Sequence, residues 1–225
     1  RKKFLAKVGH RIYDGWVKEK KHQWIRISFL GAARQVGRTC FLLQTPESRI
    51  IIDCGIDPSQ KGPEQYPYLD APEFNIQEID AVVGRHSHLD HSGMIPYLFK
   101  YGYEGPVYCT LPTRDIMSLL QLDMVKIQRG EGLDPIYTSE EVKKVVLHTI
   151  PIEYGAVTDI TPDVRLTLYN AGHILGSAMA HFNIGNGLHN LVYTGDIKYG
   201  RTNLLEAANT QFPRVETMIM EVKSL

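Results

Sequence analysis

The segment that decides the fold reads IDAVVGRHSHLDHSG and spans residues 79–93. Its first part, Ile79–Val83, is a short apolar run that predicts a buried strand. Three histidines and one aspartate follow within six residues: His86, His88, Asp90 and His91. Imidazole and carboxylate groups are the ligands that suit zinc and similar divalent ions. A solvated loop that is rich in histidine by chance is the alternative, and the close spacing favours a metal site.

The direction of these side chains depends on the backbone. If the segment is extended, side chains alternate between two faces, so His86, His88 and Asp90 point to the same side. We expect the chain to bend at Ser92-Gly93 and to turn His91 toward the same point. Four polar groups would then converge directly after a strand, where a rigid scaffold commonly carries a site.

The bulk composition describes an ordinary globular protein. The chain has 225 residues, of which 43% are hydrophobic and 22% are charged. This length suits one large domain, or a domain with a tail, and allows a sizeable core. No apolar run approaches the roughly 18–20 residues that a membrane-spanning helix needs. The N-terminus is basic but lacks the apolar region of a signal peptide.

Three cysteines, Cys40, Cys54 and Cys109, lie far apart and form no C-x-x-C pair. An odd and sparse set fits a reducing compartment better than a disulfide scaffold. We expect all three to be small buried hydrophobic residues and the protein to be cytoplasmic.

Charge is distributed unevenly along the chain, although the net charge is zero. Residues 1–26 hold nine Lys and Arg against two acidic residues, so this segment carries +7 and the remainder carries −7. A basic arm on an acidic body suggests a polyanionic partner. A solvated surface segment is an equally good explanation of charge alone.

Short strands dominate the pattern of the chain, and helices interrupt them. We expect strands at residues 24–30, 39–44, 49–53, 79–83, 106–109, 148–152, 164–169, 178–184, 189–194 and 217–221. We expect helices at residues 92–100 with Ser92 as N-cap, at 113–128, and after a second N-cap at Ser139. Residues 55–75 contain four prolines and predict a long ordered loop. This order of elements favours two packed sheets with helices outside.

Two further segments carry ligand chemistry. Residues 171–177 read AGHILGS and set His173 between glycines, which allow unusual backbone angles and close approach. Residues 193–196 read YTGD and place Asp196 at the end of an apolar strand, where a carboxylate without a cationic partner would be costly to bury. The candidate set is therefore four histidines and two aspartates: His86, His88, His91, His173, Asp90 and Asp196.

Six such groups are too many for one tetrahedral zinc ion. They suit two metals about 3.5–4 Å apart that share a bridging carboxylate and a bridging hydroxide. Asp53 would then orient a ligand imidazole through its second ring nitrogen, or it is an ordinary turn residue at a strand end. The other histidines have no such context, and we expect them at the surface or in packing: His10, His22, His148, His181 and His189.

These motifs and their order resemble the metallo-β-lactamase fold superfamily. The order is Asp53 in IDCG, the H-x-H-x-D-H run at 86–91, then His173 and Asp196. Residues 29–40 (FLGAARQVGRTC) and 172–178 (GHILGSA) resemble its β-CASP branch, whose members cleave RNA or DNA. The match is best to the archaeal cleavage-and-polyadenylation-specificity-factor-like ribonucleases, in which a KH-type RNA-binding module precedes the nuclease.

The resemblance implies an α/β (α+β) fold, a four-layer αββα sandwich with two zinc ions. One zinc would take His86, His88 and His173, the other would take Asp90, His91 and a further histidine, and Asp196 would bridge. A hydroxide between the metals would attack a phosphodiester and leave a 5′-phosphate and a 3′-hydroxyl.

The catalytic residues would be Asp53, Asp90 and Glu221, the last of which matches the first β-CASP motif and would orient a general-acid histidine. The function implied is RNA 3′-end processing or transcription termination by an endonuclease, with 5′–3′ exonuclease action as an open alternative. The partners implied are single-stranded RNA and the transcription machinery, with a homodimer for the full-length protein.

The chain departs from the family after Glu221. The family continues there with Ser-Thr-Tyr-Gly, whereas this chain reads VKSL at 222–225 and stops. We therefore expect residues 1–22 to be the end of a KH-type module or linker and residues 23–225 to be the metallo-β-lactamase domain. The β-CASP domain, with its general-acid histidine and the last zinc histidine, would be missing. We expect weak or no nuclease activity from residues 1–225.

A second departure is Arg85, where the family usually has threonine. An arginine beside two cations should weaken metal binding unless it faces outward or grips phosphate. We expect Arg85 to face outward.

Two other functions remain open at this point. Another hydrolase on the same fold, such as a thioesterase or lactonase, would turn over a small thioester without binding RNA. A non-catalytic RNA-binding subunit would have lost metal ligands, which this chain retains as far as it runs.

Overall fold

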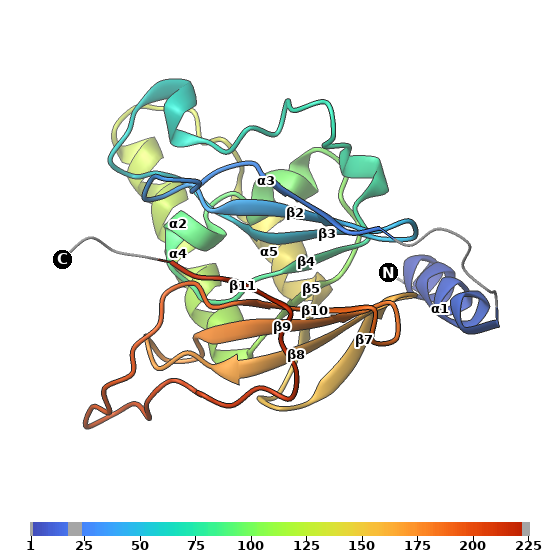
Figure 1. Ribbon diagram of the computed structural model, residues 1–225. Coiled ribbons are helices and arrows are strands. Elements are labelled where there is room, and N and C mark those ends of the chain that lie inside the picture. Colours follow the sequence, from blue (N-terminus) through green and yellow to red (C-terminus); the bar gives the residue numbers. More distant parts are fainter. Residues whose placement is uncertain (1, 18–23, 222–225) are drawn as a thin grey trace.

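Two β-sheets form the centre of the molecule, and the computed structural model describes residues 2–17 and 24–221 (Figure 1). The first sheet has the order β1 (Arg26–Phe29), β2 (Cys40–Gln44), β3 (Arg49–Cys54), β4 (Ala81–Val83), β5 (Val107–Cys109) and β6 (Thr149–Pro151). The second has the order β11 (Thr217–Ile219), β10 (His189–Tyr193), β9 (Ala178–Ile184), β8 (Val164–Asn170) and β7 (Val157–Thr161).

Strand direction changes within each sheet. In the first sheet β1, β2 and β3 are antiparallel, and β3 to β6 run parallel. In the second, only β10 and β11 are parallel. Parallel strands need crossover connections, and the helices supply several of them. The helices are α1 (Lys2–Val17), α2 (Leu89–Ser92), α3 (Ile95–Lys100), α4 (Leu111–Gly130) and α5 (Ser139–His148), with 3₁₀ turns η1 (Gly62–Gln65) and η2 (Ile76–Glu78).

The period-two alternation of β2 and β3 divides the hydrophobic core into two layers. Leu42 and Ile51 face the helices, where they pack with residues such as Met117 of α4. Their neighbours in the same strands, such as Phe41 and Ile52, face the second sheet and pack against its inner side chains. The first sheet is therefore buried on both faces, which explains why β2 to β5 read as continuous apolar runs.

The outer face of the second sheet carries a smaller cluster of Ala171, Met179 and Ala208. The irregular chain that follows β10 passes below this sheet (Figure 1), and α1 contacts β7. The predicted α/β architecture, two packed sheets with helices outside, is confirmed.

Several predicted element boundaries were wrong. The helix expected at 92–100 is two helices, because the chain already turns at Leu89 and α3 starts again after Met94. Ser92 is not an N-cap, since its hydroxyl donates to the carbonyl of Ser87. The cap of α5 is Thr138, which forms a capping box with Glu141. Strand β7 was missed, because its exposed edge residues carry little apolar signal.

The side chains expected to serve packing do so. The three cysteines are free and buried, and burial raises the pKa of Cys109 to about 12. His148 and His181 contact backbone carbonyls of Gly105 and Arg214, His189 contacts the Thr217 hydroxyl, and His10 is exposed. His22 lies outside the described residues. No helix in residues 2–17 or 24–221 is long and apolar enough to span a bilayer.

Candidate metal centre

The candidate site lies where five strands end on one edge of the sandwich. Parallel strands β3 and β4 end beside each other in the first sheet, and β8, β10 and β11 run in a common direction in the second. Polar residues follow or close each of these strands: Asp53 in β3, His86 and His88 after β4, His173 after β8, Asp196 after β10 and Glu221 after β11. The topology thus brings together residues that are far apart in sequence.

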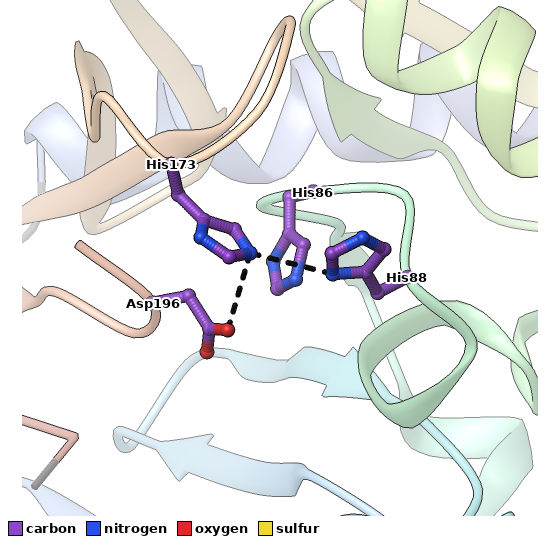
Figure 2. Close-up of side chains that lie close together, drawn as sticks. All are labelled: His86, His88, His173 and Asp196. Atoms are coloured by element: carbon purple, nitrogen blue, oxygen red, sulfur yellow. Dashed lines mark hydrogen bonds and ion pairs between the residues drawn. The ribbon is translucent and has the colours of Figure 1, made fainter. Parts of the chain in front are cut away.

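Four side chains form the first group. Figure 2 shows His86, His88, His173 and Asp196 pointing toward one another from three separate loops. The Nε2 atom of His173 lies 3.2 Å from Oδ2 of Asp196 and 3.4 Å from Nδ1 of His88. One ligand atom from each of the four lies within 4.8 Å of all the others. A spacing of this size fits nitrogen and oxygen ligands around one cation.

His86 has the properties of a neutral ligand. It is 1% exposed, and its Nε2 atom is buried without a hydrogen-bond partner among the described residues. Burial lowers the pKa of His86 well below its ordinary value, and the nearby charges of His91 and Arg85 lower it further. A buried nitrogen without a hydrogen bond is costly, and a cation at this point would remove the cost.

A second group lies beside the first. The Nε2 atom of His91 is 3.3 Å from Oδ1 of Asp196 and 3.5 Å from Oδ2 of Asp90. Glu221 completes a set with His91 and Asp196 whose ligand atoms also lie within 4.8 Å of one another. Asp196 therefore belongs to both groups, and the second group is richer in oxygen than the first.

The donor set fits two divalent cations. The three imidazoles of the first group and the carboxylates of the second are the ligand types that such ions take in proteins. All six predicted ligands come together. One detail of the expectation was wrong: Asp90 does not share an extended segment with His86 and His88, because it lies in the first turn of α2 beside His91.

Arg85 was expected to face outward, and this expectation was wrong. The residue is fully buried, and its guanidinium lies under the cluster against Asp53. Arg85 Nη2 is 2.5 Å and Nε is 2.9 Å from Oδ2 of Asp53. The guanidinium also donates to the carbonyl of Thr194 and the hydroxyl of Tyr193, and it lies 3.9 Å from the Tyr193 ring centroid. A buried partner 32 positions earlier in the chain outweighs the preference of a charged side chain for water.

Asp53 contacts the cluster through His91. Its Oδ2 atom lies 2.9 Å from Nδ1 of His91, on the ring side opposite the proposed ligand atom. Burial opposes ionisation of Asp53 most strongly, but the charge of Arg85 and the hydrogen bond with His91 prevail, so the pKa of Asp53 is lowered. The backbone at Asp53 has a φ of +56°, a left-handed conformation that is uncommon outside glycine and is often found at functional sites.

His91 has the opposite shift to His86. Burial lowers its pKa, but hydrogen bonds with Asp196 and Asp53 outweigh burial and raise the pKa to about 9. Three acidic side chains around one imidazole attract a positive charge to this point. A proton or a metal ion would satisfy them equally.

Sequence reasoning missed two contributors to the site. Tyr193 fixes Arg85 through its ring and hydroxyl, and Gly195 makes room for Arg85, because a Cβ atom at this position would overlap the guanidinium. Neither role has a signal in the sequence without knowledge of where Arg85 points. The loop at residues 32–37 also lines a groove together with Asp90, His91 and Glu221. Ala32 and Arg34 in this loop adopt left-handed conformations, as does Arg38 directly after it.

Comparison with known proteins agrees with this geometry. A family model described as "Metallo-beta-lactamase superfamily domain" matches residues 42–223. The chain is similar to curated proteins named transcription termination factor FttA. It is 56% identical over 220 residues to that of Methanococcus maripaludis, covering 98% of this chain and 34% of the relative. It is 52% identical over 228 residues to that of Pyrococcus abyssi, covering 98% and 35%. The chain thus spans about a third of the length of these relatives.

Solved structures show a similar fold at low sequence identity. A metallo-β-lactamase of Cronobacter sakazakii matches with a TM-score of 0.52 and 22% identity, over 75% of this chain and 61% of the other. A protein of unknown function from Enterococcus faecalis matches with a TM-score of 0.56 and 19% identity, over 79% and 44%. These likenesses concern the fold alone.

Proposed function

This chain belongs to the metallo-β-lactamase superfamily, and we propose that it is the hydrolytic part of a transcription termination factor that cleaves RNA with two zinc ions. The proposal joins three lines of support. The superfamily supplies a hydrolase fold, the cluster supplies ligands for two cations, and the similar archaeal proteins are named as termination factors.

One observation carries the proposal. His173 and Asp196 follow different strands of the second sheet, and both meet the histidines that follow β4 of the first sheet (Figure 2). Folding alone does not require polar side chains from both sheets to converge, because each would be better solvated elsewhere. Convergence of this kind is what a shared metal centre needs.

The ligand roles follow from the two groups. His86, His88 and His173 would hold one cation, Asp90 and His91 would hold the other, and Asp196 would lie between them. Bound there, two divalent cations would generate a nucleophile from water at neutral pH and neutralise the charge that develops on a phosphodiester. Asp53 would orient His91 by accepting the proton of its Nδ1 atom, which keeps the lone pair of Nε2 directed into the cluster.

Glu221 lies close enough to the second group to have a role there besides the expected orientation of a general-acid histidine. Its carboxylate approaches the atoms of His91 and Asp196 that face the second position. We propose that the Glu221 carboxylate lines the second metal position and adds negative charge there. The alternative for Glu221 is the role that the family resemblance implies, in which its carboxylate orients a general-acid histidine that is not among the described residues.

Single-stranded RNA is the proposed substrate. The basic segment at residues 1–26 provides positive charge that attracts phosphate. Arg34 is exposed on the loop that lines the groove beside Asp90 and His91, and an arginine there can bind a phosphate oxygen. The transcription machinery and a second copy of the full-length protein are proposed partners. The division into residues 1–22 and 23–225 is likewise a proposal.

The test is to load the purified chain with Zn²⁺ and to measure its metal content together with RNA binding and cleavage. We expect two ions per chain, binding of single-stranded RNA, and only slow cleavage that stops when the metal is chelated. Turnover of a small thioester or lactone without RNA binding would assign the site to another hydrolase class. A chain that binds no metal would overturn the proposal.

A further inference from the structure

We propose that Arg85 makes the two metal positions unequal. By occupying Asp53, Arg85 weakens the support that this carboxylate gives to His91, so the Asp90–His91 position binds its cation at least about tenfold more weakly than the three-histidine position. The inference rests on the proposed function, because it presupposes that both positions take a metal. It assigns to Arg85 a positioning role that acts through Asp53 and His91.

The first step is that Arg85 donates hydrogen bonds to both carboxylate oxygens of Asp53. Both side chains are fully buried. The backbone nitrogen of Arg85 donates to Oδ1 of Asp53 at 3.0 Å, and its Nε and Nη2 atoms both donate to Oδ2. The guanidinium stays charged at every relevant pH, so the negative charge of Asp53 is matched within the pair. A carboxylate that supports a metal-bound imidazole normally offers that charge to the histidine.

The second step concerns the His91 ring. Its Nδ1 atom lies 2.9 Å from Oδ2 of Asp53 and also 2.9 Å from Nη2 of Arg85. The contact with Asp53 needs a proton on Nδ1, whereas a guanidinium only donates and so needs a lone pair there. One nitrogen cannot satisfy both at once. A guanidinium hydrogen directed at Nδ1 would oppose the contact between Nδ1–H and Asp53 that keeps the lone pair of Nε2 free for a metal. Arg85 therefore competes with the form of His91 that is a ligand.

The third step is that the other position lacks this competitor. The nitrogen atom Nε2 of His173 lies close to Nδ1 of His88 and to Asp196, and the described contacts of these two histidines and His86 include no guanidinium hydrogen bond like that of Arg85 with His91. The Nε2 atom of His86 is buried without a hydrogen-bond partner among the described residues, so no described donor competes with a cation for that nitrogen. The two positions share Asp196. They differ in the number of histidines that they offer and in what lies behind those histidines, and Arg85 acts on the second difference.

The place of Arg85 is built into the fold. Gly195 has a φ of +50°, and a side chain there would overlap the guanidinium. Tyr193 covers one face of the guanidinium with its ring. If Arg85 swung outward, it would leave a void and an unpaired buried carboxylate, and both are unfavourable. The unequal positions are thus a fixed property of this chain.

The experiment is a titration of the metal-free chain with Zn²⁺ against a chelating indicator, followed in parallel by ¹⁵N NMR of the histidine rings. We expect two binding steps whose affinities differ at least tenfold. The first equivalent should shift the ring nitrogens of His86, His88 and His173, and the second should shift those of His91. Two equal steps, or a shift of His91 with the first equivalent, would overturn the inference.

The variant Arg85→Met removes the charge and the donors while keeping an unbranched side chain of similar length. We expect the second affinity to rise by about 10- to 100-fold, with the first affinity unchanged. The matched control is Arg38→Met, because Arg38 is also buried and stacked on a tyrosine, Tyr68. The control should alter neither affinity. An unchanged second affinity in folded Arg85→Met would contradict the inference.

Arg85→Met leaves Asp53 buried without its cation, so the variant can fail to fold. Arg85→Lys keeps the charge but cannot present the same fork of donors, and we expect it to give a smaller rise in the second affinity. If both variants are unstable, two equal affinities in the titration of the unaltered chain would still overturn the inference. Absence of any bound metal would overturn the proposed function itself, whereas two equal sites would overturn only the role of Arg85.

Discussion

The Nε2 atom of His173 lies 3.2 Å from Oδ2 of Asp196. The first residue follows β8 and the second follows β10, strands that β9 separates in the sheet. Together with the histidines that follow β4 of the first sheet, these two residues form a cluster of metal-ligand side chains at this edge of the sandwich.

Replacement of Asp196 should affect both metal positions at once. In Asp196→Asn the shape of the side chain is nearly kept, but the charge shared by the two groups is lost. We expect zinc affinity to fall at least about tenfold at each position, and any RNA cleavage to disappear. Elemental analysis after dialysis measures the metal. A variant that retains two tightly bound ions would show that Asp196 does not bridge.

Replacement of Asp53 should destabilise the protein before it affects chemistry. Asp53→Asn leaves the buried Arg85 without its anion, and breaking such a pair costs about 3–5 kcal/mol. The double variant Asp53→Asn/Arg85→Met, which removes both charges, should recover a large part of this loss. Urea unfolding of the chelated chains compares the three proteins. Equal stability of the single variant and the parent would mean that the pair is not buried as described.

The chelated chain should lose stability as the pH rises from about 6.5 to about 9. The pKa of His91 is raised to about 9 in the folded protein, against about 6.5 when unfolded. Its proton therefore stabilises the fold fully below pH 6.5, and this contribution of about 3 kcal/mol disappears as the pH passes 9. Unfolding free energies across this range test the direction. His91→Gln should flatten the curve, and a parent curve that is already flat would exclude the shift.

Arg34 should contribute to RNA binding without contributing to the fold. It is exposed on the groove-lining loop at residues 32–37, and truncation there would remove one proposed phosphate contact. We expect Arg34→Ala to weaken binding of single-stranded RNA and to reduce its salt dependence by about one phosphate, with thermal stability unchanged. Arg165→Ala is the control, because Arg165 lies on β8 in an exposed pair with Asp159. Equal binding by both variants would remove Arg34 from the substrate path.

The sequence predicts the ligand cluster well because its residues are chemically distinctive. The run at residues 86–91, the glycine-flanked His173 and the strand-end Asp196 have few uses other than a metal site, and the structure brings them together. The order of strands also follows from the apolar runs, since β2 to β5 are buried on both faces.

Arg85 could not be placed in the same way. Its orientation depends on Asp53, Tyr193 and Gly195. No local sequence pattern predicts that these three residues lie next to Arg85. A lone arginine prefers water, so the sequence favours the outward position. The start of α2 at Leu89 was missed for a related reason: Ser92 has the form of an N-cap, but its hydroxyl serves the Ser87 carbonyl.

The number of metal ions bound per chain tests the central claim most directly. After loading with Zn²⁺ and removal of excess ion, elemental analysis should find two ions in the unaltered chain and one in His88→Ala, which keeps the Asp90–His91 position. No bound zinc in the unaltered chain, or the same content in His88→Ala, would contradict a metal centre built from these residues.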